Sequence, residues 1–268
     1  MFITIDEPYA MTDVGLRRNN EDSVFPEPEG VSERDRLFLV CDGVGGAEKG
    51  EVASALACES INSYFNAFLG DNDADAGFIS KAVSYAESCF DTYVENHPGA
   101  KGMATTLALL YLSSNGVSVA HVGDSRVYQF RNGHAIYQTK DHSLVESLVE
   151  MKLITPEEAA VHPKRNVILR AIEGTARPAE VEVTTLNDVE AGDYFFLCSD
   201  GVLEHCPTET LESIFATSLS PLEIKIRIAE KCAGKTRDNY SFYLIHVRNV
   251  RESGSLAQNI LSFLYSFI

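Results

Sequence analysis

The feature that most constrains the fold is the segment from Met103 to Gln138, in which short apolar runs alternate with turn signals. The runs are rich in β-branched and aromatic residues, and the pairs Asn115-Gly116 and Asn132-Gly133 stand between them. Asn-Gly between two apolar runs is the strongest short-range signal for a β-hairpin. The segment therefore predicts an antiparallel meander.

Helical periodicity precedes this meander in two segments, which predict a pair of long helices. The expected buried faces comprise Ala53, Ala57, Ile61, Tyr64, Phe65 and Phe68 in the first helix, and Phe78, Ala82, Tyr85, Ala86, Cys89 and Tyr93 in the second. After the meander, a polar helical segment leads to two further strand-like runs, Tyr194–Ser199 and Tyr240–Val247. Helices and strands grouped in blocks, without regular βαβ alternation, predict an α+β layered domain.

Composition narrows the class of protein. The 268 residues are 45% hydrophobic and 23% charged, which is typical of a globular domain. The net charge of −17 argues against nucleic acid as a partner, because the chain repels polyanions. Six cysteines without a CxxC pair indicate a reducing compartment, and the sequence contains neither a signal peptide nor an apolar run long enough for a membrane span. We therefore expect a cytoplasmic protein.

Four aspartates follow or precede predicted strands. Asp42 and Asp200 each end an apolar run and are followed by glycine, Asp124 lies between two strands, and Asp238 comes just before the last strand. Each alone is more often a turn former, but the set is larger than capping requires. Carboxylates gathered at one edge repel one another unless cations neutralise them, and oxygen ligands favour Mg²⁺ or Mn²⁺. Glycine after Asp42 also lets a backbone carbonyl approach an ion.

A phosphate-binding residue is also available near the N-terminus. Arg17 and Arg18 stand just ahead of the acidic pair Glu21 and Asp22. The planar guanidinium matches phosphate oxygens, although a surface arginine taken alone is more often a solvated charge.

Eight motifs together resemble a known family. GLRRNNED, CDGVGG, MATTLALL, HVGDSRVY, KDHSLVESLV, HPKRNVILRAIEG, LCSDGV and RDNYSFYLI occur in the order and approximate spacing of PPM/PP2C-type metal-dependent protein serine/threonine phosphatases, and they are most similar to the bacterial branch. The resemblance runs from about Tyr9 to Arg248. It implies a four-layer α-β-β-α sandwich, with two central antiparallel sheets flanked by helix pairs. It divides the chain into a phosphatase domain at 1–248, with a small flap at about 144–165, and a C-terminal tail at 249–268.

The resemblance also implies the metal ligands. Asp42 would bridge two Mn²⁺ or Mg²⁺ ions, and the carbonyl of Gly43 would bind one of them. Asp200 and Asp238 would complete the shell of the other ion. Asp124 matches a residue that holds a weaker third metal in bacterial members, and Asp200 would be the second ligand of that metal.

Further roles follow from the same resemblance. Glu21 and Asp22 match the acidic pair that holds metal-bound waters, Asn239 matches the amide beside the last ligand, and Arg17 matches the phosphate-binding arginine. The implied reaction is hydrolysis of phosphoserine or phosphothreonine in proteins by a metal-bridging hydroxide, without a phosphoenzyme.

The general acid of this reaction stays open. The eukaryotic branch has a histidine in its DGHGG motif, where this chain has Val44. His142 is a candidate general acid. Two alternatives are that His142 only orders the edge of the sheet, and that a metal-bound water donates the proton.

Other functions fit the sequence less well. The pair His205-Cys206 resembles the start of a cysteine-phosphatase loop, but Glu212 stands where that loop needs arginine. The glycine run fails as a dinucleotide fingerprint because Glu48 replaces its third glycine. A metal-dependent nuclease conflicts with the acidic composition. The serious alternative is a catalytically weak pseudophosphatase that binds phosphoproteins.

The expected partners are proteins phosphorylated on serine or threonine, and a bacterial serine/threonine protein kinase that the enzyme opposes. The C-terminal tail is amphipathic, with its apolar residues near one helical face: Leu256, Ile260, Leu261, Leu264 and Phe267. Three readings of the tail remain open, namely docking on its own domain, contact with a partner or second copy, and contact with a membrane surface.

Overall fold

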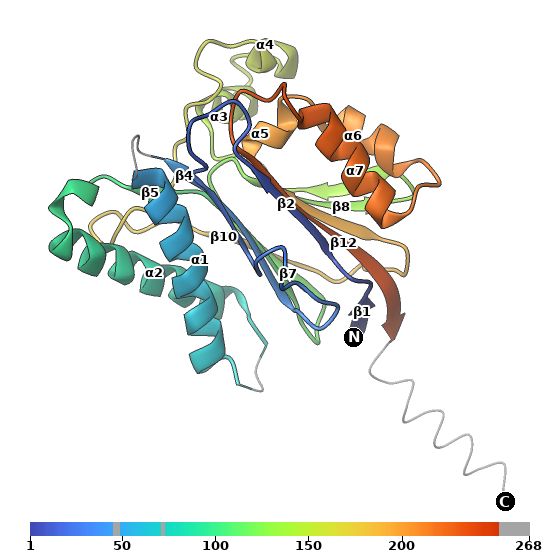
Figure 1. The fold of residues 1–268 in the computed structure, drawn as a ribbon, viewed down its shortest axis with the longest axis horizontal. Coiled ribbons are helices and arrows are strands. Elements are labelled where there is room, and N and C mark those ends of the chain that lie inside the picture. The colour runs from blue at the N-terminus through green and yellow to red at the C-terminus, as the bar shows by residue number, and fades with distance from the viewer. Residues whose placement is uncertain (45–48, 71–72, 252–268) are drawn as a thin grey trace, which may run out of the picture.

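A computed structural model describes residues 1–44, 49–70 and 73–251. Two antiparallel sheets form its centre, and helices cover both outer faces (Figure 1). The strands are β1 (Phe2–Ile5), β2 (Tyr9–Asp13), β3 (Asp22–Phe25), β4 (Leu37–Val44), β5 (Ala104–Thr105), β6 (Leu107–Leu112), β7 (Val117–Val122), β8 (Arg126–Arg131), β9 (His134–Gln138), β10 (Glu182–Leu186), β11 (Tyr194–Cys198) and β12 (Tyr240–Arg251). The helices are α1 (Lys49–Phe68), α2 (Ala76–Asn96), the short 3₁₀ helix η1 (Pro98–Ala100), α3 (Leu144–Glu150), α4 (Pro156–Ala160), α5 (Asp200–Leu203), α6 (Thr208–Phe215) and α7 (Pro221–Cys232).

The strands divide between the sheets in a way that mixes early and late parts of the chain. One sheet has the order β1-β12-β11-β8-β9, with β2 also paired to β12. The other has the order β10-β7-β6-β4-β3, with β5 paired to β4. The two predicted hairpins are confirmed, but the prediction of one meander is wrong, because β6 and β7 pair in one sheet whereas β8 and β9 pair in the other. The turn between β7 and β8 therefore crosses between the layers.

Alternation of side chains along the central strands builds three hydrophobic layers. In β4, Leu39 and Cys41 face α1 and α2, whereas Phe38 and Val40 face the interior between the sheets. In β11, Phe196 faces α6 and α7 while its neighbours face the same interior. Because both faces of each sheet are covered, these strands read as continuous apolar runs rather than as alternating polar and apolar residues.

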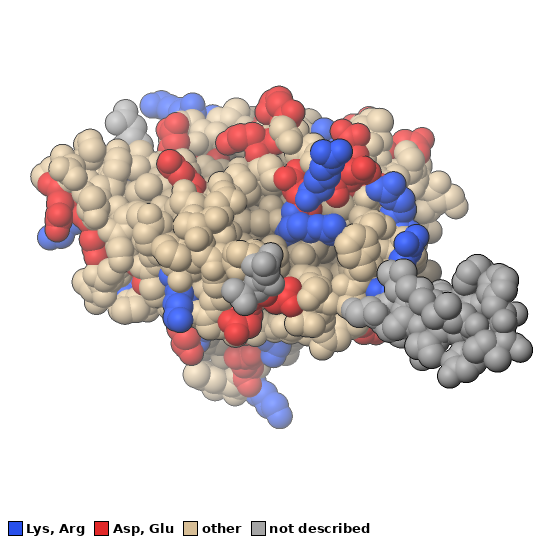
Figure 2. Space-filling view, turned by 90° about the horizontal axis from the view of Figure 1, so that it is seen from below, with Lys and Arg blue, Asp and Glu red and all other residues tan. Residues whose placement is uncertain are grey.

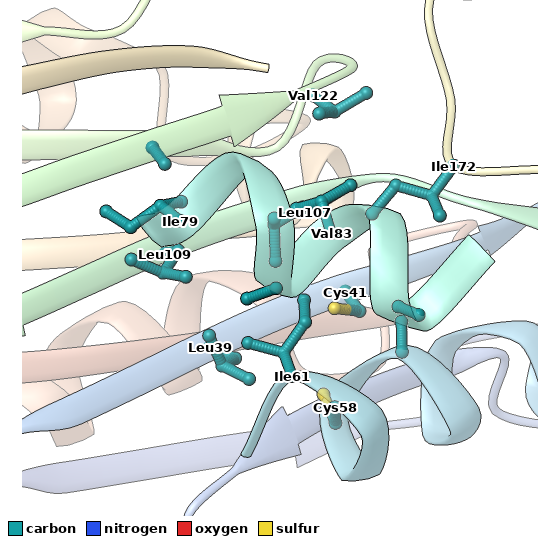
Figure 3. Packing of buried hydrophobic residues seen from close by; sticks show 14 of the residues in the cluster. Leu39, Cys41, Cys58, Ile61, Ile79, Val83, Leu107, Leu109, Val122 and Ile172 are labelled. Carbon is teal, nitrogen blue, oxygen red and sulfur yellow. The ribbon is translucent and has the colours of Figure 1, made fainter. Parts of the chain in front are cut away.

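The helix pair α1 and α2 covers the sheet that contains β4 (Figures 1 and 3). Figure 3 shows Ile61 of α1 beside Leu39 of β4, and Ile79 of α2 beside Leu109 of β6. On the opposite outer face, α6 and α7 cover β11 and β12. The sequence prediction of a four-layer α+β sandwich is therefore confirmed.

The flap segment rises from one end of the sandwich (Figure 1). It contains α3 and α4, which are capped by the side chains of Ser143 and Thr155. On a different face of the molecule, Lys and Arg side chains lie among Asp and Glu side chains, so the negative net charge forms no continuous patch there (Figure 2).

The last strand, β12, continues to Arg251, which lies within the segment predicted as a tail. The apolar face predicted for that tail lies outside the described residues, and its role stays a prediction. Among the helices that the structure describes, none is long and apolar enough to cross a membrane.

Candidate metal centre and active site

Five aspartates meet at the end of the sandwich that carries the flap. Asp42 lies near the end of β4, and Asp22 stands opposite it in β3. Asp200 begins α5 directly after β11, Asp238 precedes β12, and Asp124 lies in the turn between β7 and β8. The other four carboxylates all act electrostatically on Asp42. The structure thus brings together the four strand-end aspartates that the sequence singled out, and it adds Asp22 to them.

Two threonines hold the main chain at Asp42. The hydroxyl of Thr106 accepts a hydrogen bond of 3.0 Å from the Asp42 N–H, and the hydroxyl of Thr105 donates one of 2.9 Å to the Asp42 carbonyl. The hydroxyl of Ser125, beside Asp124, lies 2.6 Å from that of Thr106. These contacts fix the position of one ligand candidate and connect it to the turn that carries another.

A serine organises the other side of the centre. The Ser199 hydroxyl donates a hydrogen bond of 2.7 Å to Oδ2 of Asp22, and it accepts one of 2.9 Å from the N–H of Ser241. Asp22 and Ser199 are both buried. The carboxylate of Asp22 is therefore held in one orientation beneath Asp42.

Burial and mutual repulsion disfavour the charged forms of these carboxylates. Burial, with smaller contributions from neighbouring aspartates, raises the pKa of Asp22 to about 7, that of Asp200 to about 6 and that of Asp124 to about 8. Burial and repulsion by the other four also raise the pKa of Asp42 well above its usual range. Bound cations would remove this repulsion and let all five ionise.

Two buried oxygens support a fit to divalent cations. Oδ1 of Asp22 and Oδ1 of Asp200 have no hydrogen-bond partner among the described residues. Buried polar atoms are rarely left without a partner, so an unpaired pair beside other carboxylates suits an ion or its bound waters. The donor set consists of oxygens alone, which is the ligand type that Mg²⁺ and Mn²⁺ prefer.

Glycines permit the close approach of main chains around the centre. A Cβ on Gly43 would lie 2.0 Å from the carbonyl oxygen of Gly50, and one on Gly201 would lie 1.9 Å from that of Asn239. Real Cβ atoms do not approach other atoms so closely, so neither position accepts a side chain without a shift of the backbone. The remaining glycines of the CDGVGG motif, Gly45 and Gly46, lie outside the described residues.

Arg17 lies at the rim of the centre. Its guanidinium forms an ion pair of 2.6 Å with Oδ2 of Asp238, and about half of its side chain (53%) stays exposed. Arg17 and Asp238 also line a hollow of about 270 Å³, together with Arg165 and Arg237. A guanidinium in this position can contact an anion that sits beside the carboxylates.

Asn239 connects the loop that carries Arg17 to the last strand. Its side-chain oxygen accepts a hydrogen bond of 2.8 Å from the N–H of Glu21, and its amide nitrogen donates bonds of 2.9 Å to the carbonyls of Val14 and Asn19. The carbonyl of Glu21 in turn accepts a bond of 3.0 Å from the N–H of Gly43. One amide thus links the arginine loop, the acidic pair and β4.

His142 lies in a different environment. Its ring stacks on that of His121, with centroids 4.3 Å apart, and its Nδ1 accepts a hydrogen bond of 3.2 Å from the N–H of Gly123. Its Nε2 lies 3.2 Å from the Arg170 guanidinium and 3.5 Å from the Glu182 carboxylate. Burial, then His121 and Arg170, lower the pKa of His142. Of the described residues, His142 is not one of those that line the two hollows beside the carboxylates.

A groove of about 840 Å³ runs from the carboxylates along the flap. Asp124 and Asp200 line it, the flap helices α3 and α4 form one wall, and Leu203 with the chain that follows α5 forms the other. The groove is large enough for several side chains of a peptide.

Sequence reasoning missed three residues that organise the centre, namely Thr105, Thr106 and Ser199. Their motifs carried a weak signal, because two threonines precede the β6 run and a serine precedes Asp200. Serine and threonine side chains at strand ends usually form hydrogen bonds within a local turn. Only the fold reveals that these three hydroxyls form hydrogen bonds with residues distant in the sequence.

Comparison with known proteins agrees with this arrangement. The profile described as Protein phosphatase 2C matches residues 18–231. The chain is 39% identical over 207 residues to the serine/threonine protein phosphatase PstP of Mycobacterium tuberculosis, which covers 75% of this chain and 37% of that protein. The chain thus matches only about a third of the length of that relative. It is 31% identical over 252 residues to the serine/threonine phosphatase stp of Listeria innocua, which covers 91% of this chain and 96% of that protein.

Solved structures give the same result. The crystal structure of the M. tuberculosis phosphatase PstP/Ppp aligns with a TM-score of 0.78 at 33% identity, covering 91% of this chain and all of that one (100%). The catalytic domain of PstP in complex with two manganese ions aligns with a TM-score of 0.74 at 32% identity, covering 91% of this chain and 99% of that one. From its sequence, its fold and its carboxylate centre, the chain belongs to the protein phosphatase 2C family.

Proposed function

We propose that this protein is a metal-dependent protein phosphatase that hydrolyses phosphoserine and phosphothreonine in other proteins. The observation that carries the proposal is the cluster of aspartates with two unpaired buried oxygens, on Asp22 and Asp200, beside the exposed guanidinium of Arg17. A phosphate monoester needs both features, because cations and a guanidinium offset the charge that its oxygens carry in the transition state.

The carboxylates would hold two Mn²⁺ or Mg²⁺ ions. Asp42 would bridge them, the carbonyl of Gly43 would bind one, and Asp200 and Asp238 would bind the other. Asp124, with Asp200, would hold a weaker third ion. The structure with two manganese ions in a relative supports this assignment. When bound, the ions would supply a water of lowered pKa as the nucleophile, so no phosphoenzyme would be needed.

The residues of this chain would then position the reactants. Glu21 and Asp22 would orient waters on the ions, and the bond from Ser199 would hold Asp22 in place. Arg17 would exchange its ion pair with Asp238 for the phosphate oxygens, since metal binding would satisfy that carboxylate. Asn239 would keep the arginine loop in register with β4 through its three hydrogen bonds.

The substrate class rests on the relatives, whose names describe serine/threonine phosphatases. We infer that the physiological substrates are phosphorylated proteins, and that a serine/threonine protein kinase is their source. We also infer a reducing, cytoplasmic location, which is supported by the free state of the six cysteines.

The experiment that tests this function is hydrolysis of a phosphothreonine peptide at increasing Mn²⁺, with a chelator control. Turnover should depend on the metal and be abolished in Asp200→Asn, which removes a ligand charge with little change in shape. The matched control is Asp188→Asn, because Asp188 is exposed and pairs with Arg131 at the far end of β8. Metal binding without turnover in the natural protein would replace the proposal with the pseudophosphatase alternative.

The general acid stays a prediction. Because both ring nitrogens of His142 contact protein groups, we expect His142→Gln to slow an aryl phosphate and a phosphothreonine peptide to the same extent. An aryl leaving group needs little protonation, whereas an alkoxide needs much more. A selective loss on the peptide would assign the role of general acid to His142.

A further inference from the structure

The flap helices contain no buried residue. α3 has seven residues and α4 has five, and no side chain of either helix is fully buried. Isolated helices of this length are not stable in water, so the caps at Ser143 and Thr155 are not sufficient and the helices also need to pack against other residues. Val145 and Val149 of α3 and Ala159 of α4 are only half-buried. The flap therefore has apolar surface that its own domain does not cover.

That surface lines the groove. Val145, Val149 and Ala159 lie on its flap wall, and Leu203 and Pro207 lie on the opposite wall. We call this part of the groove, defined by these five residues, the apolar subsite. Four of these side chains are half-buried and Pro207 is exposed, so a third apolar group between the two walls would bury more of their surface, which is favourable.

The same groove contains the carboxylates of Asp124 and Asp200. A phosphorylated residue held at the metal centre therefore has its neighbours in the peptide at the entrance to the apolar subsite. Charged side chains also line the groove. Arg126 forms a two-pronged pair with Asp141, at 2.7 and 2.8 Å, and Glu146, Glu204, Glu209, Lys235 and Arg237 line the groove beyond the five residues of the apolar subsite. The continuity of the groove with the centre identifies the occupant as the substrate itself.

We propose that the apolar subsite binds an aliphatic side chain of the substrate phosphopeptide, close in sequence to the phosphorylated residue, and that this contact orders the flap over the centre. The inference rests on the proposed phosphatase function and adds a substrate class to it, namely phosphoproteins with leucine or a similar residue near the phosphorylated position. An apolar pocket of this kind discriminates by roughly 10-fold to 200-fold between side chains that differ in apolar size.

The test is a panel of phosphothreonine peptides in a serine and glycine background, each with one leucine placed at a different position on either side of the phosphothreonine. An aryl phosphate serves as the substrate without a peptide. We expect kcat/KM to rise about 10-fold for leucine at one or two positions. Failure on every substrate, including the aryl phosphate, would refute the phosphatase function. Equal turnover of the whole panel would refute only the apolar subsite.

Variants of Val149 test whether the apolar subsite is the origin of the preference for leucine in the peptide. Val149→Ser should lower the ratio of kcat/KM between the preferred leucine peptide and its serine counterpart by about 10-fold. Val149→Leu should fill part of the subsite and shift the preference from leucine toward valine. The matched control is Met151→Ser, because Met151 is an apolar flap residue that is 69% exposed and is not among the groove-lining residues described. A ratio that changes equally in Val149→Ser and Met151→Ser would overturn the proposal.

Discussion

The hydroxyl of Ser199 donates a hydrogen bond of 2.7 Å to Oδ2 of Asp22, and this bond joins the two sheets at the candidate metal centre. Asp22 lies in β3 of one sheet, whereas Ser199 follows β11 of the other. The contact links the two layers next to Asp42 and Asp200, which we propose to be metal ligands.

Removal of that bond should affect both stability and metal binding. Ser199→Ala removes the hydrogen bond to Oδ2 of Asp22, whose Oδ1 has no partner among the described residues, and this should lower the free energy of unfolding by about 1 to 3 kcal/mol. Loss of an orienting group should weaken Mn²⁺ binding by roughly 10-fold to 100-fold. Urea denaturation in chelator and calorimetric Mn²⁺ titration measure the two effects. Ser213→Ala, which removes only a bond within α6, should change neither.

The effect of Asp42→Asn on thermal stability should have opposite signs in the absence and in the presence of Mn²⁺. In chelator, Asp42→Asn should unfold at a higher temperature than the natural protein, because it removes the cost of either burying the Asp42 charge among four other carboxylates or protonating that carboxylate. In saturating Mn²⁺ the order should invert, since only the natural protein gains the binding free energy. Thermal unfolding under both conditions tests this crossover. A variant that is less stable under both conditions would show that repulsion does not dominate the metal-free centre.

Gly201 should not tolerate a methyl group. Gly201→Ala places a Cβ 1.9 Å from the Asn239 carbonyl oxygen, so either α5 or the start of β12 has to move. We expect a loss of about 3 kcal/mol in the free energy of unfolding and a fall in turnover, because the shift separates Asp200 from Asp238. Gly99→Ala is the control, since a Cβ there meets nothing within 4 Å. Natural stability and activity in Gly201→Ala would contradict the close packing of α5 against β12.

Acidification should destabilise the environment of His142. Burial lowers the pKa of His142 and of His121 below their usual value of 6.5, so the unfolded chain binds more protons than the folded chain just below that pH. The contribution of these two histidines to the free energy of unfolding should therefore be fully retained above about pH 6.5 and be lost as the pH falls toward their folded-state pKa. The carboxylates of the centre, whose pKa values are raised, contribute with the opposite sign, so the histidine effect is read as the difference between the natural protein and His142→Gln. His142→Gln should reduce this slope in urea denaturation. His134→Gln, at a side chain that is 80% exposed, should leave the slope unchanged.

The helix faces show the limits of periodicity. It placed Ala53, Ala57 and Ile61 of α1 correctly in the core, but it also included Phe68 in α1 and Tyr85 in α2, which are 61% and 41% exposed. Tyr85 packs on Tyr64 of the neighbouring helix, with ring centroids 5.7 Å apart, at the edge of the layer. A helix that packs on both a sheet and a second helix has a wider buried face than its own periodicity indicates. For that reason the sequence prediction did not include Phe90 of α2, which is buried.

The sequence by itself determined that Asp42, Asp124, Asp200 and Asp238 lie near strand termini, and that the first three of them adjoin a glycine. This follows from local chemistry, because a carboxylate is costly inside an apolar core and is therefore placed toward the end of a buried strand. Only the tertiary structure decided that Asp22 faces Asp42, that hydroxyls from distant strands hold both, and that His142 stacks on His121. It also decided that the flap leaves an apolar groove open toward the centre. These contacts depend on which strands pair and how the two sheets stack, and burial of apolar surface across the whole chain settles that arrangement.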